Sequence, residues 1–157
     1  MKYTRLTKEQ FEELQPEFIN FLASQSITGE EWKSIKEEKS ELAEQELDVF
    51  SDLVWEGVLN QAKFLENISP QQLFLFSVGK DEFSLIVVKV TNDYYDITTS
   101  EGYTWLQHNF ASDDVQFFTS SKKFSKDKNM DVFSLIQQGS VITKGELYNF
   151  FHKILAS

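Results

Sequence analysis

Cysteine is absent from this sequence of 157 residues, arginine occurs once, and there are only six glycines and two prolines. Without cysteine the chain has no disulfides, thiolate zinc sites, iron–sulfur clusters or thiol nucleophiles. Few glycines and prolines, together with 41% hydrophobic and 15% aromatic residues, exclude an intrinsically disordered chain, which lacks the apolar surface to offset its ordering entropy. We therefore expect one folded domain over residues 1–157.

Basic residues are also scarce, since 25 acids face 15 bases and the net charge is −10. Nucleic-acid affinity depends on neutralising phosphates with a patch of arginine and lysine. An acidic chain whose sole arginine is Arg5 repels a polyanion, so we expect no nucleic-acid partner. A basic or neutral protein is the better match, above all for residues 1–67, which hold 15 acids and 7 bases.

Long hydrophobic runs are missing as well. No stretch approaches the roughly 20 apolar residues that cross a bilayer, so we expect no direct membrane insertion. The first residues, Met1 to Glu13, show no basic region followed by an apolar core, the pattern of a secretory signal peptide. The expected location is therefore the cytoplasm.

The first predicted helix begins with a capping box, Thr7 followed by Gln10. Its apolar residues then recur at three- and four-residue spacing to about Ala23, which is typical of one buried helix face. Pro16 removes a backbone donor inside this stretch, so we expect a kink or a break there.

Two more helices follow in the first half of the chain. Thr28 opens a short one that ends near Lys39, and Ser40 caps a long one that extends to about Asn67. The apolar residues of the long helix form a stripe and then widen beyond it, which indicates a helix packed on more than one side. The stripe comprises Leu47, Phe50, Val54, Val58, Ala62 and Leu65, and the wider surface Val49, Leu53, Trp55 and Leu59.

After Pro70 the hydrophobic period changes from near 3.6 to near 2. Residues 73–78 and 83–90 predict a β-hairpin, and residues 94–99 a third antiparallel strand. The two central strands are nearly continuous apolar runs, so we expect both faces of the sheet to be covered.

The rest of the chain alternates between helix and strand signals. Gly139 is suited to end one of the helices, and Thr143 with Glu146 to cap the last. The expected elements are a helix over 100–110, a strand over 115–119, a mobile polar loop over 120–129, a helix over 130–138 and a final helix after Thr143. The fold class is therefore α+β, with N-terminal helices including one long helix, a small mainly antiparallel sheet and C-terminal helices.

The most suggestive polar feature is an acidic stripe on the long helix: Glu44, Asp48, Asp52 and Glu56 recur every four residues and so share one face. With Trp55 beside them, these residues are our candidate protein-binding site. The alternative is a solvated helix face. Carboxylates on one helix face, without a loop that turns oxygens inward, make a poor metal site, so no metal site is predicted.

Catalytic motifs are missing. His108 and His152 lie outside the spacings of metal or nucleophile motifs, and the chain contains neither a dinucleotide-binding nor a phosphate-binding glycine loop. We therefore expect no catalytic residues, no cofactor and no enzymatic activity.

The order of a long helix, three strands, a helix and a strand is similar to the core of restriction-endonuclease-like nucleases. That similarity implies an acid two residues before a strand lysine. Here Lys89 is preceded at that position by Val87, and Asp96 has no lysine two residues later. A degenerate nuclease-like core is therefore the enzymatic alternative.

Three segments carry a resemblance to a known family: MKYTRLTKEQFEEL, AEQELDVFSDLVWEGVL and ITKGELY. They resemble small, acidic, uncharacterised proteins of the Bacteroidetes, a family that implies no catalytic residues. In size and character the chain also resembles the plug subunit of the type 9 secretion translocon. That resemblance implies a role in protein transport, an outer-membrane translocon as partner and a place at the periplasmic face of the outer membrane.

These observations favour a non-catalytic protein-protein interaction module, with a plug-like accessory subunit as its narrower form. The alternatives are a cytoplasmic protein with a degenerate nuclease-like core and an acidic regulatory binding protein.

Overall fold

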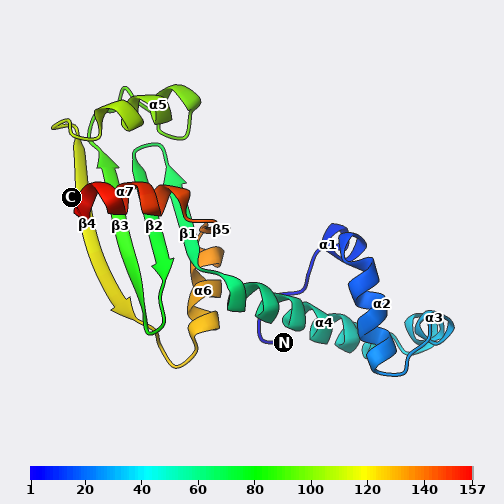
Figure 1. Cartoon of the computed structure of the whole chain (residues 1–157). Helices are drawn as coiled ribbons and strands as arrows, with labels where there is room; N and C mark the ends of the chain where they lie inside the picture. The colour runs from blue at the N-terminus through cyan, green and yellow to red at the C-terminus, as the bar shows by residue number, and fades with distance from the viewer. Residues whose placement is uncertain (157) are drawn as a thin grey trace. The chain divides into compact units, whose positions relative to one another are not determined.

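The computed structural model describes residues 1–156, which form two compact units, Met1–Asn60 and the part that begins at Gln61. The first is helical and the second holds an antiparallel sheet with helices (Figure 1). The α+β class with N-terminal helices, a small antiparallel sheet and C-terminal helices is thus confirmed. The single domain over residues 1–157 stays a prediction.

The first unit begins with two short helices where the sequence predicted one with a kink or break. Thr7 closes its capping box with Gln10 and opens α1, and the chain breaks at Leu14 so that Pro16 falls in the first turn of α2. Proline is tolerated there because the first turn has no intrahelical partner for its missing N–H. The helices of this unit are α1 (Lys8–Glu13), α2 (Gln15–Ser24), α3 (Gly29–Glu38) and α4 (Ser40–Gln61).

An aromatic cluster forms the core of the first unit. Phe50 of α4 is buried, and its ring lies 5.0 to 6.0 Å from the rings of Phe11, Phe18 and Phe21. Trp32 of α3 meets Phe18 edge-on. Clustered rings at these separations stabilise a core beyond the area they bury, so the apolar periodicity of the first helices is confirmed as core.

The long helix is shorter than predicted. It ends at Gln61, and a strand, β1 (Phe64–Ser69), replaces its expected last turns. Leu65 is buried in that strand, where it pairs with Phe76. A period of 3.6 fits this short apolar stretch as well as a period of 2, and pairing with the next strand decides the conformation.

The sheet has five strands in the order β4-β3-β2-β1-β5, each paired antiparallel with its neighbours. The predicted hairpin is confirmed. The fourth predicted strand runs on through Ser120 to Lys123, so the expected loop over 120–129 is mostly strand and helix. The strands beside β1 are β2 (Gln72–Val78), β3 (Glu82–Val90), β4 (Val115–Lys123) and β5 (Val141–Thr143).

The predicted strand over residues 94–99 is wrong. Asp96 accepts hydrogen bonds from the backbone N–H and the hydroxyl of Thr98, and Thr99 then caps α5 (Ser100–Asn109). An aspartate that bonds the backbone two residues later favours a turn over a sheet ladder.

Two further helices complete the second unit, α6 (Lys128–Gln137) and α7 (Glu146–Ala156). Gly139 follows α6 with φ of 109°, a conformation that suits glycine, as expected. Thr143 is not the cap of α7. It ends β5, and its hydroxyl accepts a hydrogen bond from the N–H of Gly145.

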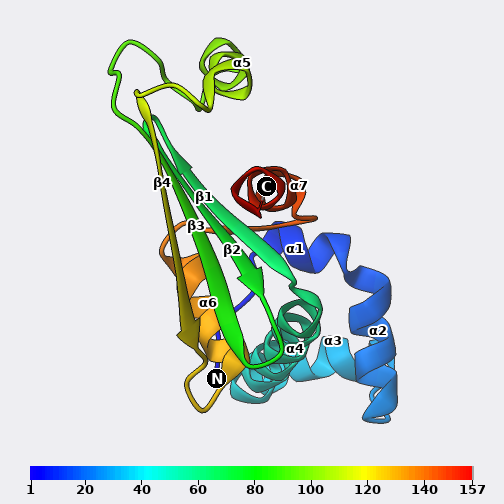
Figure 2. The same cartoon turned by 60° about the vertical axis from the view of Figure 1, so that its left-hand side comes forward.

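The two faces of the sheet differ, and the expectation that both are covered holds for one. Helix α7 crosses the first face (Figures 1 and 2). Phe151 of this helix belongs to the same buried core cluster as Leu75 and Val88. On the other face, α6 lies toward one end. Beyond it, Phe118 remains 53% exposed. A continuous apolar run can therefore leave one sheet face partly open to solvent.

Candidate protein-binding face of helix α4

Helix α4 brings the predicted acidic stripe together. Glu44, Asp48, Asp52 and Glu56 follow one another along a single helix face, as their spacing requires. Asp48, Asp52 and Glu56 are half-buried, and Glu44 is exposed. The half-burial has a specific cause within the first unit, which is the N-terminal segment, residues 1–6.

The N-terminal segment binds the C-terminal half of the stripe. The Asp52 carboxylate accepts hydrogen bonds from the backbone N–H groups of Lys2 and Tyr3, at 2.7 and 2.9 Å. The Tyr3 hydroxyl donates to Glu56 at 2.5 Å. Burial raises the pKa of Tyr3, and the bond to Glu56 raises it further. The Lys2 ammonium nitrogen lies 3.8 Å from Oε2 of Glu56.

Arg5 binds the N-terminal half of the stripe. Its Nε and Nη2 donate to Asp48 at 2.8 and 2.6 Å, and its Nη1 donates to Glu44. These bonds raise the pKa of the guanidinium, Asp48 contributing most. A guanidinium that forks onto carboxylates gives both energy and a fixed geometry.

The segment is anchored once more at Leu6, which is buried and whose N–H donates to the buried Ser51 hydroxyl at 3.1 Å. Sequence reasoning missed this arrangement. The available signal was the coincidence of Lys2, Tyr3 and the lone arginine within six residues. The stripe therefore already binds the extended, basic N-terminal segment of the same chain.

An exposed apolar strip lies next to the stripe on the same helix. Leu42, Val49 and Leu53 are 36%, 49% and 57% exposed, and their spacing of seven and four residues places them on one face. The sequence had suggested that α4 packs on more than one side, which is wrong for Val49 and Leu53. We call these three residues the α4 strip.

Carboxylates border the α4 strip on both sides. Helix geometry places Asp52 and Glu56 along one edge and Glu46 along the other. Glu46 Oε2 is buried with no hydrogen-bond partner among the described residues. Trp55, the aromatic member of the predicted site, is half-buried on α4. The strip is apolar, exposed and set in a negative border.

The remaining sequence candidates do not come together as a site. Lys89 is exposed and faces Gln72 and Gln116 across the strands, and Asp96 lies in a turn. His152 stacks on Tyr148 of the same helix at 5.7 Å. Within residues 1–156 no three histidine, aspartate or glutamate side chains gather where they could hold a metal ion.

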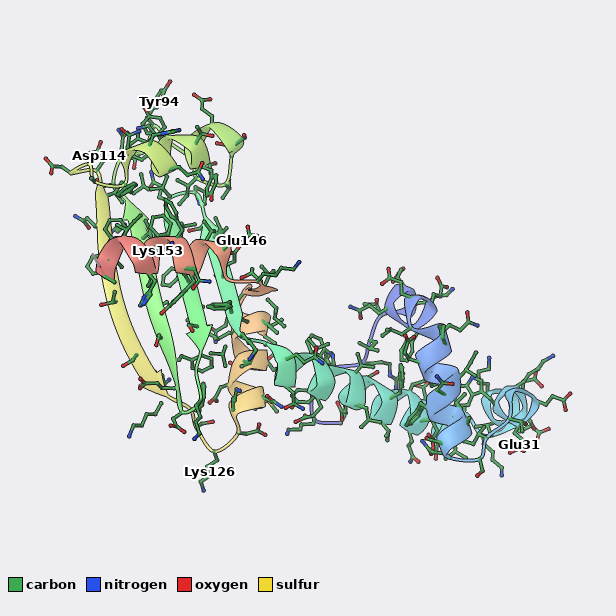
Figure 3. All side chains as sticks on the ribbon, in the orientation of Figure 1. Glu31, Tyr94, Asp114, Lys126, Glu146 and Lys153 are labelled. Carbon is green, nitrogen blue, oxygen red and sulfur yellow. The ribbon has the colours of Figure 1, made fainter. Side chains whose placement is uncertain are left out.

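The second unit also exposes an aromatic side chain in the segment between β3 and α5. Tyr94 is 78% exposed (Figure 3). Tyr95 stacks on Trp105 with ring centroids 4.1 Å apart. Trp105 is therefore part of the packing of the second unit, and Tyr94 lies at its surface.

Of the helices in residues 1–156, none is long and apolar enough to cross a membrane. Among known proteins, no curated protein and no solved structure matches the chain. A family does, over residues 1–156, and its description is "family of unknown function (DUF6495)". The expectation of an uncharacterised family is confirmed, and the chain belongs to the family of unknown function DUF6495.

Proposed function

We propose that the protein is a non-catalytic protein-binding module whose contact surface is the α4 strip with its carboxylate border. The observation that carries this proposal is the exposure of Leu42, Val49 and Leu53 along one face of a 22-residue helix. Large apolar side chains that share one exposed face are typical of interaction sites, whereas single exposed ones are ordinary.

The border specifies the charge of the partner. Asp52 and Glu56 of the stripe and Glu46 border the strip, and the N-terminal segment brings the four acids of the stripe only Lys2 and Arg5. The surface therefore remains negative after the segment has bound. Complementary charge speeds association and disfavours acidic competitors. A basic amphipathic helix matches both the apolar spacing and the border.

The acids also act within the chain, which sharpens the original hypothesis for this site. Asp48 and Asp52 hold the N-terminal segment, so replacing the whole stripe changes folding and charge at once. The α4 strip, by contrast, is a surface whose change leaves the bonds of the segment in place. It is the cleaner target for a test.

The test is quantitative affinity capture of the tagged full chain from the cells that make it, comparing Leu53→Glu with wild type. Ile19→Glu is the matched control, because Ile19 is 56% exposed on α2 and lies off the strip. We expect a protein that wild type and Ile19→Glu recover equally and that Leu53→Glu loses by tenfold or more. Equal recovery by all three would contradict the proposal.

The narrower hypotheses stay predictions. A plug-like subunit of the type 9 translocon, with its periplasmic location, rests on resemblance of size and character. Recovery of an outer-membrane translocon in the same capture would support it. The degenerate nuclease-like core requires an acid near Lys89, whose neighbours across the strands are glutamines. An increase in melting temperature with divalent metal would favour it.

A further inference from the structure

The second unit contains a cavity of about 390 Å³ between α6 and the less covered face of the sheet. One wall is a row of cross-strand neighbours, Phe76, Leu85 and Ser120, from β2, β3 and β4. The opposite wall includes Ser134 and Leu135 of α6. Volumes of about 300 to 1,000 Å³ with mostly apolar walls are typical of small-molecule sites.

One cation faces this cavity from the sheet. Lys122 is paired with Phe83, in the row next to Leu85 and Ser120, so its side chain lies on the same face as theirs. Lys123, the following residue, also borders the cavity, but the alternation of the strand directs its side chain to the opposite face, where Glu82 is its cross-strand neighbour. Lys122 has no ion-pair partner within residues 1–156.

The negative group in the cavity wall is already engaged. Asp131 accepts hydrogen bonds from the backbone N–H and the hydroxyl of Ser125, both at 2.7 Å. A ligand thus meets one free ammonium group together with the hydroxyls of Ser120 and Ser134. A second negative charge on the ligand would face Asp131 without a second cation to offset it.

We propose that this cavity binds a small aliphatic monocarboxylate, with its carboxylate on Lys122 and its chain between Phe76, Leu85 and Leu135. One charge matches one ammonium group, and the apolar walls match a hydrocarbon chain. The adjacent row of the sheet, Phe74, Val87 and Phe118, continues the apolar wall beyond the cavity. Each added methylene group therefore gains apolar contact, which raises the affinity by up to about fourfold.

The test is titration of the isotope-labelled full chain with octanoate, followed by backbone amide NMR spectra. We expect saturable shifts at Ser120, Lys122, Ser134 and Leu135, weaker binding of hexanoate, and about five- to tenfold weaker binding of octanol, which has the same chain without the charge. Shifts spread over the surface, or equal binding of octanol, would overturn the proposal.

Two variants test whether the ammonium group of Lys122 binds the carboxylate of the ligand. Lys122→Gln removes the ammonium group of the cavity, and Lys126→Gln removes one at the tip of the loop between β4 and α6 (Figure 3). We expect Lys122→Gln to weaken octanoate about five- to tenfold and Lys126→Gln to leave it unchanged. The same spectra report whether each variant is folded. Equal effects of the two variants on octanoate binding would overturn the assignment to Lys122.

Discussion

At the scale of single residues, Arg5 makes a forked contact with two carboxylates of the first unit. It joins the N-terminal segment to Asp48 and Glu44, which lie four residues apart on α4. Because the guanidinium is partly exposed, water and salt screen these bonds. The fork geometry still fixes the position of the segment on the helix.

We therefore expect Arg5→Ala to lower the free energy of unfolding by about 1 kcal/mol. Arg5→Lys keeps the charge and loses the fork, so its loss should be smaller than that of alanine but measurable. Urea titration of the three proteins measures both values. An alanine variant as stable as wild type would show that the segment is held by other contacts alone.

Glu66 makes stability depend on pH. Burial, and then the nearby carboxylate of Glu146, raise the pKa of Glu66 above its usual value. The folded chain thus holds this proton more tightly than the unfolded chain, so the free energy of unfolding falls as pH rises from the unfolded to the folded pKa. The effect is complete above the folded pKa and absent well below the unfolded one.

Glu66→Gln removes this penalty. We expect the variant to be more stable than wild type at pH 7 and to lose that advantage below about pH 4, where both states of wild type bind the proton. Thermal unfolding across pH measures the difference. Glu12→Gln, at an exposed position on α1, is the control. A difference between Glu66→Gln and wild type that does not change with pH would contradict the interpretation.

At the scale of elements, the predicted helix caps were reliable only in part. Thr7 and Thr28 cap helices as predicted, whereas Ser40 is itself the first residue of α4 and Thr143 ends β5. Thr7 and Thr28 carry signals that involve only neighbouring residues, so sequence alone identifies their helices. The strands β1 and β5 escaped prediction because β1 has a period that fits a helix equally well and β5 is only three residues long.

The candidate site, too, could be predicted from the sequence only in part. The alignment of Glu44, Asp48, Asp52 and Glu56 follows from helix periodicity and was predictable. The N-terminal segment on that stripe was not, since its bonds join residues 39 to 53 positions apart in the chain. Exposure of Val49 and Leu53 was also beyond sequence reasoning, because it depends on which helices pack around α4.

The close packing at the start of α5 yields a prediction for Gly102, with Gly57 of α4 as the comparison. A Cβ on Gly102 would lie 1.8 Å from the Asp96 carbonyl oxygen, whereas a Cβ on Gly57 in α4 meets nothing within 4 Å. We expect Gly102→Ala to lower the free energy of unfolding by about 2 kcal/mol or more. Gly57→Ala should raise it by about 0.5 to 1 kcal/mol through helix propensity.

Chemical denaturation of both alanine variants measures these changes in the free energy of unfolding. The pair is matched, since each adds one methyl group to a helical glycine. A Gly102→Ala variant with wild-type stability would mean that the turn at Asp96 shifts freely and that the start of α5 is not fixed by close backbone packing.

At the scale of the whole molecule, charge is distributed unequally between the two units. Residues 1–60 contain 14 acids and 6 bases, and the remaining residues 11 and 9. The α4 strip lies on the acidic unit, and the cavity between α6 and the sheet lies on the nearly balanced one. The charge of the first unit suits a basic protein partner, whereas the second unit is still slightly negative, so the anion binding proposed there depends on the local charge of Lys122.

The central claim is that the α4 strip contacts another protein, and site-specific photo-crosslinking in the cells that make the chain tests it most directly. A benzophenone amino acid replaces Leu53 in one sample and Ile19 in the other, so both exposed apolar positions stay apolar. We predict a covalent adduct of one defined mass from position 53 that is missing from position 19. No adduct at position 53, or the same adducts from both positions, would contradict the claim.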